Sequence, residues 1–290
     1  MRAWTWLKER ALNIYAGLAV AYMLIPIAVI AVFSFSETPK DKLNFALNGG
    51  FTLEYWETAF SLPSLNEAVL TSIELAALST LIATTLGTLM ANALVRYQFF
   101  GRRASTLLIV LPMATPEIVI GAALLSMFVA YSAPLGFPTL LIAHVMFSIS
   151  FVVVVVRSRL IGFDRSLEEA AADLGSTPFA TFRTVTLPLL APGILAAALL
   201  AFALSIDDFV ISDFNSGADT QTFPLFVFGV SLRGIPLQVN VIATMLFMLT
   251  IVAIALVLWQ QRRAERLAAV RPETTESAPG TGPGALPTAG

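Results

Sequence analysis

Four acidic residues lie within or at the edge of long stretches with no other charge: Glu74, Glu117, Asp207 and Asp208. An ionised group inside a bilayer is costly, so it usually faces a transport path or a partner. Carboxylates there favour a path for a cationic solute, because they compensate its charge as it leaves water. Neighbouring helical residues point about 100° apart, so at most one of Asp207 and Asp208 is expected to face such a path. The alternatives are an interhelical hydrogen bond for Glu117, cap or loop roles for the aspartates, and an interfacial position for Glu74.

The surroundings of Glu117 predict a site near the middle of a span. It lies 13 positions beyond residue 104, where its stretch begins, and this corresponds to about 20 Å along a helix axis. Pro112 and Pro116 lie close by in the sequence and predict a kinked helix with freed backbone carbonyls.

Missing residue types exclude several kinds of chemistry. The chain has no cysteine, which excludes disulfides, cysteine-bound zinc, iron–sulfur clusters and thiol nucleophiles. Its one histidine, His144, cannot form a His-rich metal site, and without a Cys or a second His it cannot form the catalytic group of a membrane enzyme. We expect His144 to form a hydrogen bond with a neighbouring helix. A P-loop needs Gly-Lys followed by Ser or Thr, but Lys8, Lys40 and Lys42 follow Leu, Pro and Asp. We therefore expect no metal, no cofactor and no ATP site on this chain.

The composition places these residues in a membrane protein. Hydrophobic residues make up 57% of the 290 residues and charged residues 12%, whereas soluble domains carry about 25% charged residues. The mean hydropathy is +0.81. Such a chain cannot cover a water-facing surface, which excludes a soluble, disordered, collagen-like or nucleic-acid-binding protein and makes lipid its main partner.

Uncharged runs predict six transmembrane helices in an all-α, polytopic fold. Residues 11–36, 75–95, 184–206 and 234–261 are each long enough to cross a bilayer. Residues 104–156 hold one acid and are too long for a single span, and the Pro- and Gly-containing turn at 134–138 divides them into two helices. We expect residues 1–271 to form the transmembrane domain and residues 272–290 a disordered tail.

Basic residues predict the orientation of these helices. Of the 17 Lys and Arg residues, Lys40, Lys42 and Arg233 fall on one side of the membrane and the other 14 on the opposite side. Because positive charge accumulates in cytoplasmic loops, both termini are expected in the cytoplasm of a multi-pass inner-membrane protein.

The inner loop at residues 157–187 has its own helical pattern. Ser166 and Glu169 have the spacing of a capping box, Gly175 fits a left-handed helix end, and Thr177 with Pro178 predicts a second helix start. An apolar face repeats at helical spacing and comprises Leu167, Ala170, Ala171 and Leu174. This face must be covered, either by this chain's own helix ends, with Glu169 acting only as a cap, or by another protein.

A longer motif in this loop resembles a known family. Glu169-Ala170-Ala171, then Gly175, then Val185-Thr186-Leu187-Pro188 is similar to the EAA loop of binding-protein-dependent ABC importer permeases, and Val185 stands where Ile is commoner. The resemblance implies a type I ABC importer permease fold whose cytoplasmic coupling helix docks on an ATPase subunit. The implied coupling residues are Glu168, Glu169, Ala170, Ala171, Gly175, Leu187 and Pro188.

The resemblance also implies the partners. They are a second permease subunit, two ATPase subunits that bind ATP and Mg²⁺, and an extracytoplasmic substrate-binding protein that docks on the outer segments 37–66 and 207–236. Import as the direction of transport follows from the resemblance alone.

Three further motifs resemble the spermidine/putrescine branch of these permeases: 205–211, 223–225 and 240–244, with Ile206 and Phe223 where Leu is usual. The run 116–119, which contains Glu117, is similar to the same branch. A polyamine is therefore the implied substrate, with Glu117, Asp207 and Asp208 as candidate path residues. The alternatives are a permease for another small solute and an ion-coupled secondary transporter of a cation.

Overall fold

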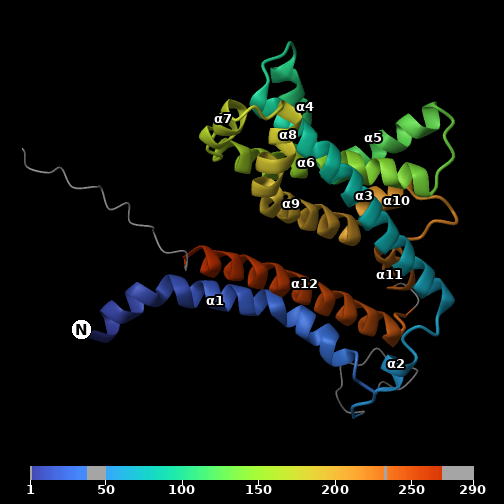
Figure 1. The fold of residues 1–290 in the computed structure, drawn as a ribbon. Helices are drawn as coiled ribbons and strands as arrows, with labels where there is room; N and C mark the ends of the chain where they lie inside the picture. Colours follow the sequence, from blue (N-terminus) through green and yellow to red (C-terminus); the bar gives the residue numbers. More distant parts are fainter. Residues whose placement is uncertain (1, 38–49, 232–233, 270–290) are drawn as a thin grey trace, which may run out of the picture. The chain divides into compact units, whose positions relative to one another are not determined.

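A computed structural model describes residues 2–37, 50–231 and 234–269 (Figure 1), and within them every regular element is helical. In chain order the elements are α1 (Arg2–Phe33), α2 (Glu54–Glu57), α3 (Pro63–Arg96), α4 (Arg102–Ala114), α5 (Glu117–Ala130), α6 (Phe137–Ile161), α7 (Ser166–Asp173), α8 (Pro178–Thr181), the π-helical η2 (Phe182–Thr186), α9 (Leu187–Asp207), α10 (Val210–Asn215), α11 (Phe223–Ser231) and α12 (Leu237–Ala269). The all-α prediction is confirmed. The predicted tail at 272–290 and the outer basic residues Lys40, Lys42 and Arg233 lie outside the described residues.

The predicted spans correspond to these helices in order. Four stretches are long and apolar enough to cross a membrane: Asn13–Phe33, Pro63–Arg96, Phe137–Ile161 and Pro178–Asp207. The α4–α5 pair meets the same test as a broken span that is bent by 113°. The last predicted span falls on α12, whose apolar part in the described chain, Leu237–Val252, is too short to meet this test. The described residues therefore contain four or five of the six predicted spans.

The bend between α4 and α5 corrects the prediction for Glu117. A kink within one span was expected, but α4 ends at Ala114 and a new helix begins at Glu117. Pro116 has no N–H to continue the helix and forces the preceding Thr115 into an extended conformation (ψ 135°). Glu117 therefore lies in the first turn of a separate helix, at the break between the two halves of the bent pair.

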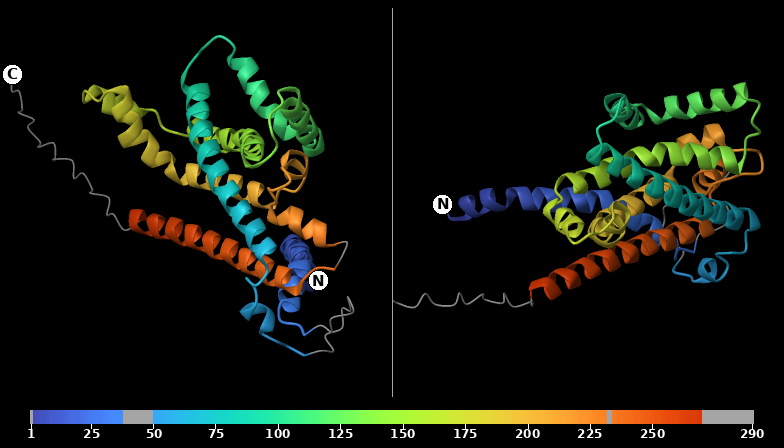
Figure 2. Two further views of the ribbon diagram at one scale, coloured as in Figure 1. Left: turned by 90° about the vertical axis from the view of Figure 1, so that its right-hand side faces the viewer. Right: turned by 45° about the horizontal axis from the view of Figure 1, so that its top comes forward.

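The chain divides into two units, one of which is Phe33–Val239. Within it, α3, α6 and α9 pack against one another in all three pairings (Figure 2). Their shared core consists largely of small and β-branched side chains, including Ala83, Ala91, Val152, Val156 and Ala197. Such residues allow membrane helices to approach closely. Van der Waals packing then stabilises the contact, because lipid offers no hydrophobic driving force between helices.

Glycines mark the closest contacts in this unit. A Cβ on Gly87 of α3 would lie 2.6 Å from Cγ1 of Val152 in α6, and one on Gly121 of α5 would lie 2.8 Å from the ring of Phe214. The segment after α10 is equally close to the α5–α6 turn, because a Cβ on Gly217 would meet the carbonyl oxygen of Leu135 at 2.4 Å. Helix α11 is joined to α3 by a 2.8 Å hydrogen bond from the Phe223 N–H to the Ser72 hydroxyl.

The other unit comprises Met1–Val32 and Asn240–Gly290. Its helix α1 exposes large apolar side chains along its length, among them Tyr15, Leu18, Tyr22 and Met23. Exposed apolar surface of this kind is what a helix in contact with lipid or with another membrane helix requires. In α12 the guanidinium of Arg263 lies 5.5 Å from the ring centre of Trp259.

Candidate functional site

Helix α7 begins at Ser166, as the sequence predicts, but a different residue stabilises its start. The predicted capping box is wrong, because Arg165 is the N-cap residue and makes no side-chain cap bond. Asp164 takes that role, since its carboxylate accepts the N–H of Ser166 at 3.0 Å. Hydrogen bonds from the backbone and the hydroxyl of Ser166 hold the pKa of Asp164 below its ordinary value.

The turn after α7 has the predicted geometry. Gly175 adopts φ +85°, a left-handed conformation that favours glycine. Its N–H donates to the carbonyl of Ala172, and the N–H of Ser176 donates to the carbonyl of Ala171. Thr177 then caps α8 by accepting the N–H of Ala180 at 3.3 Å, with Pro178 as the first helical residue.

A π-helical turn, η2, leads from α8 into α9. The N–H of Leu187 donates to the carbonyl of Phe182, five residues earlier. Pro188 follows and cannot donate, and its ring would clash with the carbonyl of Thr184 in a regular α-helix. The wider π-helical turn of η2 relieves this clash, and this explains why Pro188 is tolerated so soon after η2.

Glu168 joins α7 to two long helices. Its carboxylate accepts hydrogen bonds from the guanidinium of Arg96 at the end of α3 and from the hydroxyl of Thr186 at the start of α9. Arg96 also lies over the ring of Phe163, 5.6 Å from its centre. We call these three residues, Arg96, Glu168 and Thr186, the Glu168 clamp. A hollow of about 270 Å³ adjoins it, lined also by Asn92, Ala172 and Phe182.

The opposite face of α7 is uncovered in this chain. None of the residues of α7 is buried, and Leu174 and Phe179 are 90% and 74% exposed. Glu169 and Ala170 are exposed on the same short helix, while Ala171 is half-buried. Of the two neighbouring glutamates, Glu168 therefore faces this chain and Glu169 faces outward. Leu187 and Pro188 are exposed at the start of α9.

The two neighbouring aspartates at the end of α9 have opposite surroundings. Asp207 is exposed, whereas Asp208 is buried. The carboxylate of Asp208 accepts the N–H groups of Ile211 and Ser212 at 3.2 and 2.8 Å and the Ser212 hydroxyl at 2.9 Å. Asp208 thus stabilises the start of α10, and only Asp207 is open to a solute.

Glu117 and Asp207 come from different helices to the same part of the unit. Glu117 is exposed in the first turn of α5, and its carboxylate lies within range of electrostatic repulsion from Asp207. Helix α10 holds the two ends together because it packs against α5, where the Asn215 amide donates to the carbonyl of Gly121 at 3.3 Å. Two of the three predicted path residues therefore form one exposed acidic pair.

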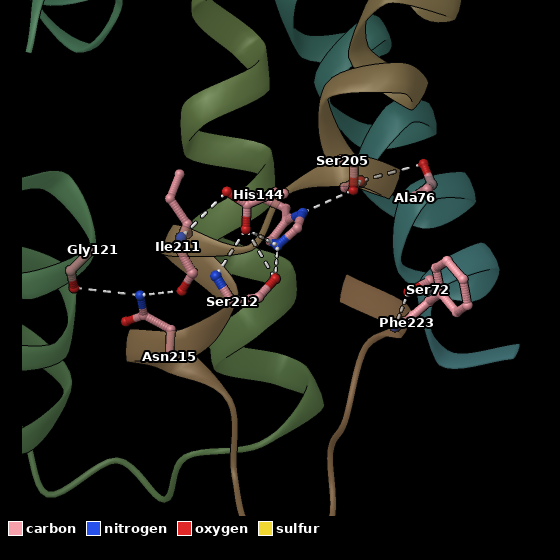
Figure 3. Close-up of polar contacts among 11 residues, drawn as sticks. Ser72, Ala76, Gly121, His144, Ser205, Ile211, Ser212, Asn215 and Phe223 are labelled. Atoms are coloured by element: carbon pink, nitrogen blue, oxygen red, sulfur yellow. Dashed lines mark hydrogen bonds and ion pairs between the residues drawn. The ribbon is translucent and has the colours of Figure 1, made fainter. Parts of the chain in front are cut away.

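A buried polar network centred on His144 joins side chains of α6, α9 and α10 (Figure 3). His144 Nδ1 lies 2.8 Å from Ser205 Oγ, and Nε2 lies 3.1 Å from Ser212 Oγ and 3.5 Å from Asp208 Oδ2. Ser205 is also 3.0 Å from the hydroxyl of Ser79. The predicted bond from His144 to a neighbouring helix is confirmed. Sequence spacing does not reveal the rest of the network, because Ser79, His144 and Ser205 lie more than 60 residues apart in the chain.

The network contains the residue types of a hydrolase triad, but its surroundings do not suit that chemistry. Ser205, Ser212 and His144 are all buried, so a substrate carbonyl has no access to either hydroxyl. In the described part of the chain, no group of three or more His, Cys, Asp or Glu residues could hold a metal ion. The arrangement suits a structural role.

Comparisons with known proteins agree with the motifs. A model of the family described as binding-protein-dependent transport system inner membrane component matches residues 83–266. The chain is 35% identical over 244 residues to the spermidine/putrescine transport system permease protein PotC of Haemophilus influenzae, a match that covers 84% of this chain and 93% of that protein. It is 36% identical over 236 residues to the putrescine transport system permease protein PotI of Escherichia coli, with 79% and 83% covered.

Solved structures share the fold. A chain of a bacterial ABC transporter that imports the acidic polysaccharide alginate superposes with a TM-score of 0.64 at 17% identity, covering 92% of this chain and 99% of that chain. A chain of an amino acid ABC transporter gives a TM-score of 0.56 at 18% identity, covering 73% and 100%. At this level of identity the likeness concerns the fold alone.

Proposed function

The chain belongs to the family of inner membrane components of binding-protein-dependent transport systems, and from this premise we propose that it conducts a polyamine through an ATP-driven importer. The type I ABC importer permease fold expected from the inner-loop motif is confirmed. The names of the relatives support spermidine or putrescine as the solute. The observation in this chain that carries the proposal is the exposed acidic pair, Glu117 and Asp207.

The acidic pair suits a polyamine for a physical reason. A polyamine carries ammonium groups separated by short methylene chains, and each charge must be compensated when it leaves water. Two carboxylates on different helices can compensate two ammonium groups at once. The exposed apolar side chains of Ile118 and Val119, which follow Glu117, can contact the methylenes between them.

We propose that ATP is hydrolysed by partner subunits and that α7 transmits the movement. One of two ATPase subunits that bind ATP and Mg²⁺ would dock on the exposed face around Leu174. The assembly would also contain a second permease subunit and an extracytoplasmic binding protein on the opposite side of the membrane. The Glu168 clamp connects α7 to α3 and α9, and Asp207 lies at the far end of α9. Movement of α7 would therefore reach the acidic pair through α9.

The experiment removes each charge of the acidic pair in the assembled transporter. We expect Glu117→Gln and Asp207→Asn each to lower ATP-dependent uptake of labelled spermidine into proteoliposomes by about tenfold, the factor that corresponds to 1.4 kcal/mol. Assembly and ATP hydrolysis should persist. Glu67→Gln, at an exposed position of α3 outside the two segments expected to meet the binding protein, is the control and should leave uptake unchanged.

Three outcomes would contradict the proposal. Unchanged uptake in both acidic-pair variants would remove the pair from the path, and spermidine uptake by this chain alone without ATPase subunits would indicate a secondary transporter. Competition by neutral or anionic solutes as strong as that by putrescine would point to a different substrate class.

A further inference from the structure

The buried network around His144 connects four separate elements of the fold. It links the side chains of Ser79 in α3, His144 in α6, Ser205 in α9 and Ser212 in α10, and it ends on the carboxylate of Asp208. All five residues are buried, and Ser79 and Ser212 are fully inaccessible. A polar network is retained at such depth only when its donors and acceptors are matched.

Counting protons restricts how this network can be arranged. A serine hydroxyl has one hydrogen to donate. If Ser212 donates to the Asp208 carboxylate, it must accept the N–H of Nε2 in His144. A neutral imidazole then has no hydrogen on Nδ1, so Nδ1 accepts from the hydroxyl of Ser205. Ser205 in turn accepts from the hydroxyl of Ser79. If Ser212 donates instead to Nε2, the direction of every hydrogen bond in the network is reversed. Nδ1 then donates to Ser205, Ser205 donates to Ser79, and Ser79 donates to the carbonyl of Ala76 at 3.3 Å.

The charge of Asp208 selects the first arrangement. A carboxylate gains more than a neutral group from a third donor, here the Ser212 hydroxyl at 2.9 Å. It also lies 3.5 Å from Nε2, where an N–H is attracted and a nitrogen lone pair is repelled. His144 therefore carries its hydrogen on Nε2, and the bonds run in one direction from Ser79 to Asp208.

The geometry points to His144 as a positioning residue for the acidic pair, an inference that rests on the proposed function. By donating to Ser212 it orients that hydroxyl toward Asp208 and so holds the Asp208 side chain inside the bundle. The helical conformation ends at this point. Asp207 is the last residue of α9, and Asp208 adopts an extended conformation with ψ 121°. Since Asp208 is fixed inward, the preceding side chain, Asp207, is turned outward to the path.

The orientation of position 207 can be measured without reference to the substrate, because this chain has no native cysteine. Asp207→Cys would be introduced into the assembled transporter with cysteine-free partners and labelled with a trimethylammonium methanethiosulfonate reagent. We expect His144→Leu to lower the labelling rate about tenfold, the order expected for the loss of a bond in a charged network. Asp219→Cys is the matched control and should label equally with or without His144→Leu.

His144→Gln separates positioning from general damage to the fold. The amide of Gln carries one donor and one acceptor about as far apart as the two ring nitrogens, so it can donate to Ser212 and accept from Ser205. We expect His144→Gln to restore most of the labelling rate at Asp207→Cys. A labelling rate that does not change with His144→Leu would overturn the inference.

A double-mutant cycle in spermidine uptake completes the test. If His144 acts through Asp207, His144→Leu lowers uptake in the native chain but causes no further loss in the Asp207→Asn background. Losses that multiply would show that His144 only stabilises the bundle, and would overturn the positioning role. Normal uptake by Asp207→Asn would instead contradict the proposed function, while the labelling rates would still report whether His144 orients position 207.

Discussion

Two pairs of neighbouring acids show how the surroundings decide what a residue does. Glu168 and Glu169 are adjacent, yet Glu168 is held by Arg96 and Thr186 while Glu169 is exposed. In the same way Asp208 accepts three hydrogen bonds inside the bundle and Asp207 has an open side chain. In each pair one member fixes the backbone and thereby presents the other to a partner or a solute.

The first pair predicts unequal effects of two similar substitutions. Glu168→Gln removes the charge that holds Arg96 at a site where both side chains are less than a fifth exposed, and we expect it to destabilise the protein by about 1–3 kcal/mol. Glu169→Gln on the exposed face should leave the melting temperature of the purified subunit within experimental error.

Uptake separates the two roles of these glutamates. We expect Glu168→Gln to reduce transport even where the ATPase subunits remain bound, because α7 is no longer joined to α3 and α9. A melting temperature and an uptake rate for Glu168→Gln equal to those of the native chain would show that the Glu168 clamp has no function.

Local features of this loop could be predicted from sequence, whereas contacts over long sequence distances could not. Gly175 and Thr177 were assigned correctly because a helix end and a helix start depend on a few adjacent residues. The capping role belongs to Asp164 because Ser166 is already helical, a difference of two positions that spacing does not resolve. The partner of Glu168, Arg96, is 72 residues away, and no periodicity connects them.

At the scale of elements, helix proximity in the Phe33–Val239 unit depends on residues without side chains. Gly87 lets α3 approach α6 so closely that a methyl group would overlap Val152. The apolar runs of the sequence predict the helices, but they do not predict which helices pack against each other. Composition does not show which neighbouring helix a glycine faces. The break before Glu117 was underestimated for a related reason, since Pro116 can either kink or end a helix.

Two glycine substitutions test this packing. We expect Gly87→Ala to destabilise the protein by about 1–3 kcal/mol, the usual cost of overpacking a close contact. Gly229→Ala in α11 is the control, because the nearest atom to its Cβ would be 4.0 Å away. Ala favours a helix over Gly by about 1 kcal/mol, so the control should melt at the same or a higher temperature. A melting temperature that is unchanged by Gly87→Ala would mean that α3 and α6 are farther apart than described.

At the scale of the whole molecule, the charge pattern predicts how the chain lies in the bilayer. Of 17 basic residues, 14 fall on the side predicted to be cytoplasmic, which is also the side of α7. The same orientation is required if α7 is to meet an ATPase subunit, because ATP is inside the cell. The orientation follows from sequence alone, since loop charge acts during insertion and before the helices pack.

Reporter fusions test this orientation. We expect a fluorescent protein fused after residue 271 to fold and fluoresce, and alkaline phosphatase inserted after Asp219 to be active, because the first reporter works inside the cell and the second works outside. The reversed pattern would place α7 on the outer side and exclude its docking on an ATPase.

The long helix that connects the Glu168 clamp to the acidic pair has a mechanical consequence. Thr186 and Asp207 are 21 positions apart, which corresponds to about 32 Å of helix. A helix of that length that tilts as one body amplifies rotation, so a tilt of about 10° at the clamp carries its far end through about 5 Å. An ammonium group and a carboxylate form an ion pair only within about 4 Å. A small swing at one membrane surface can therefore release a cation near the other.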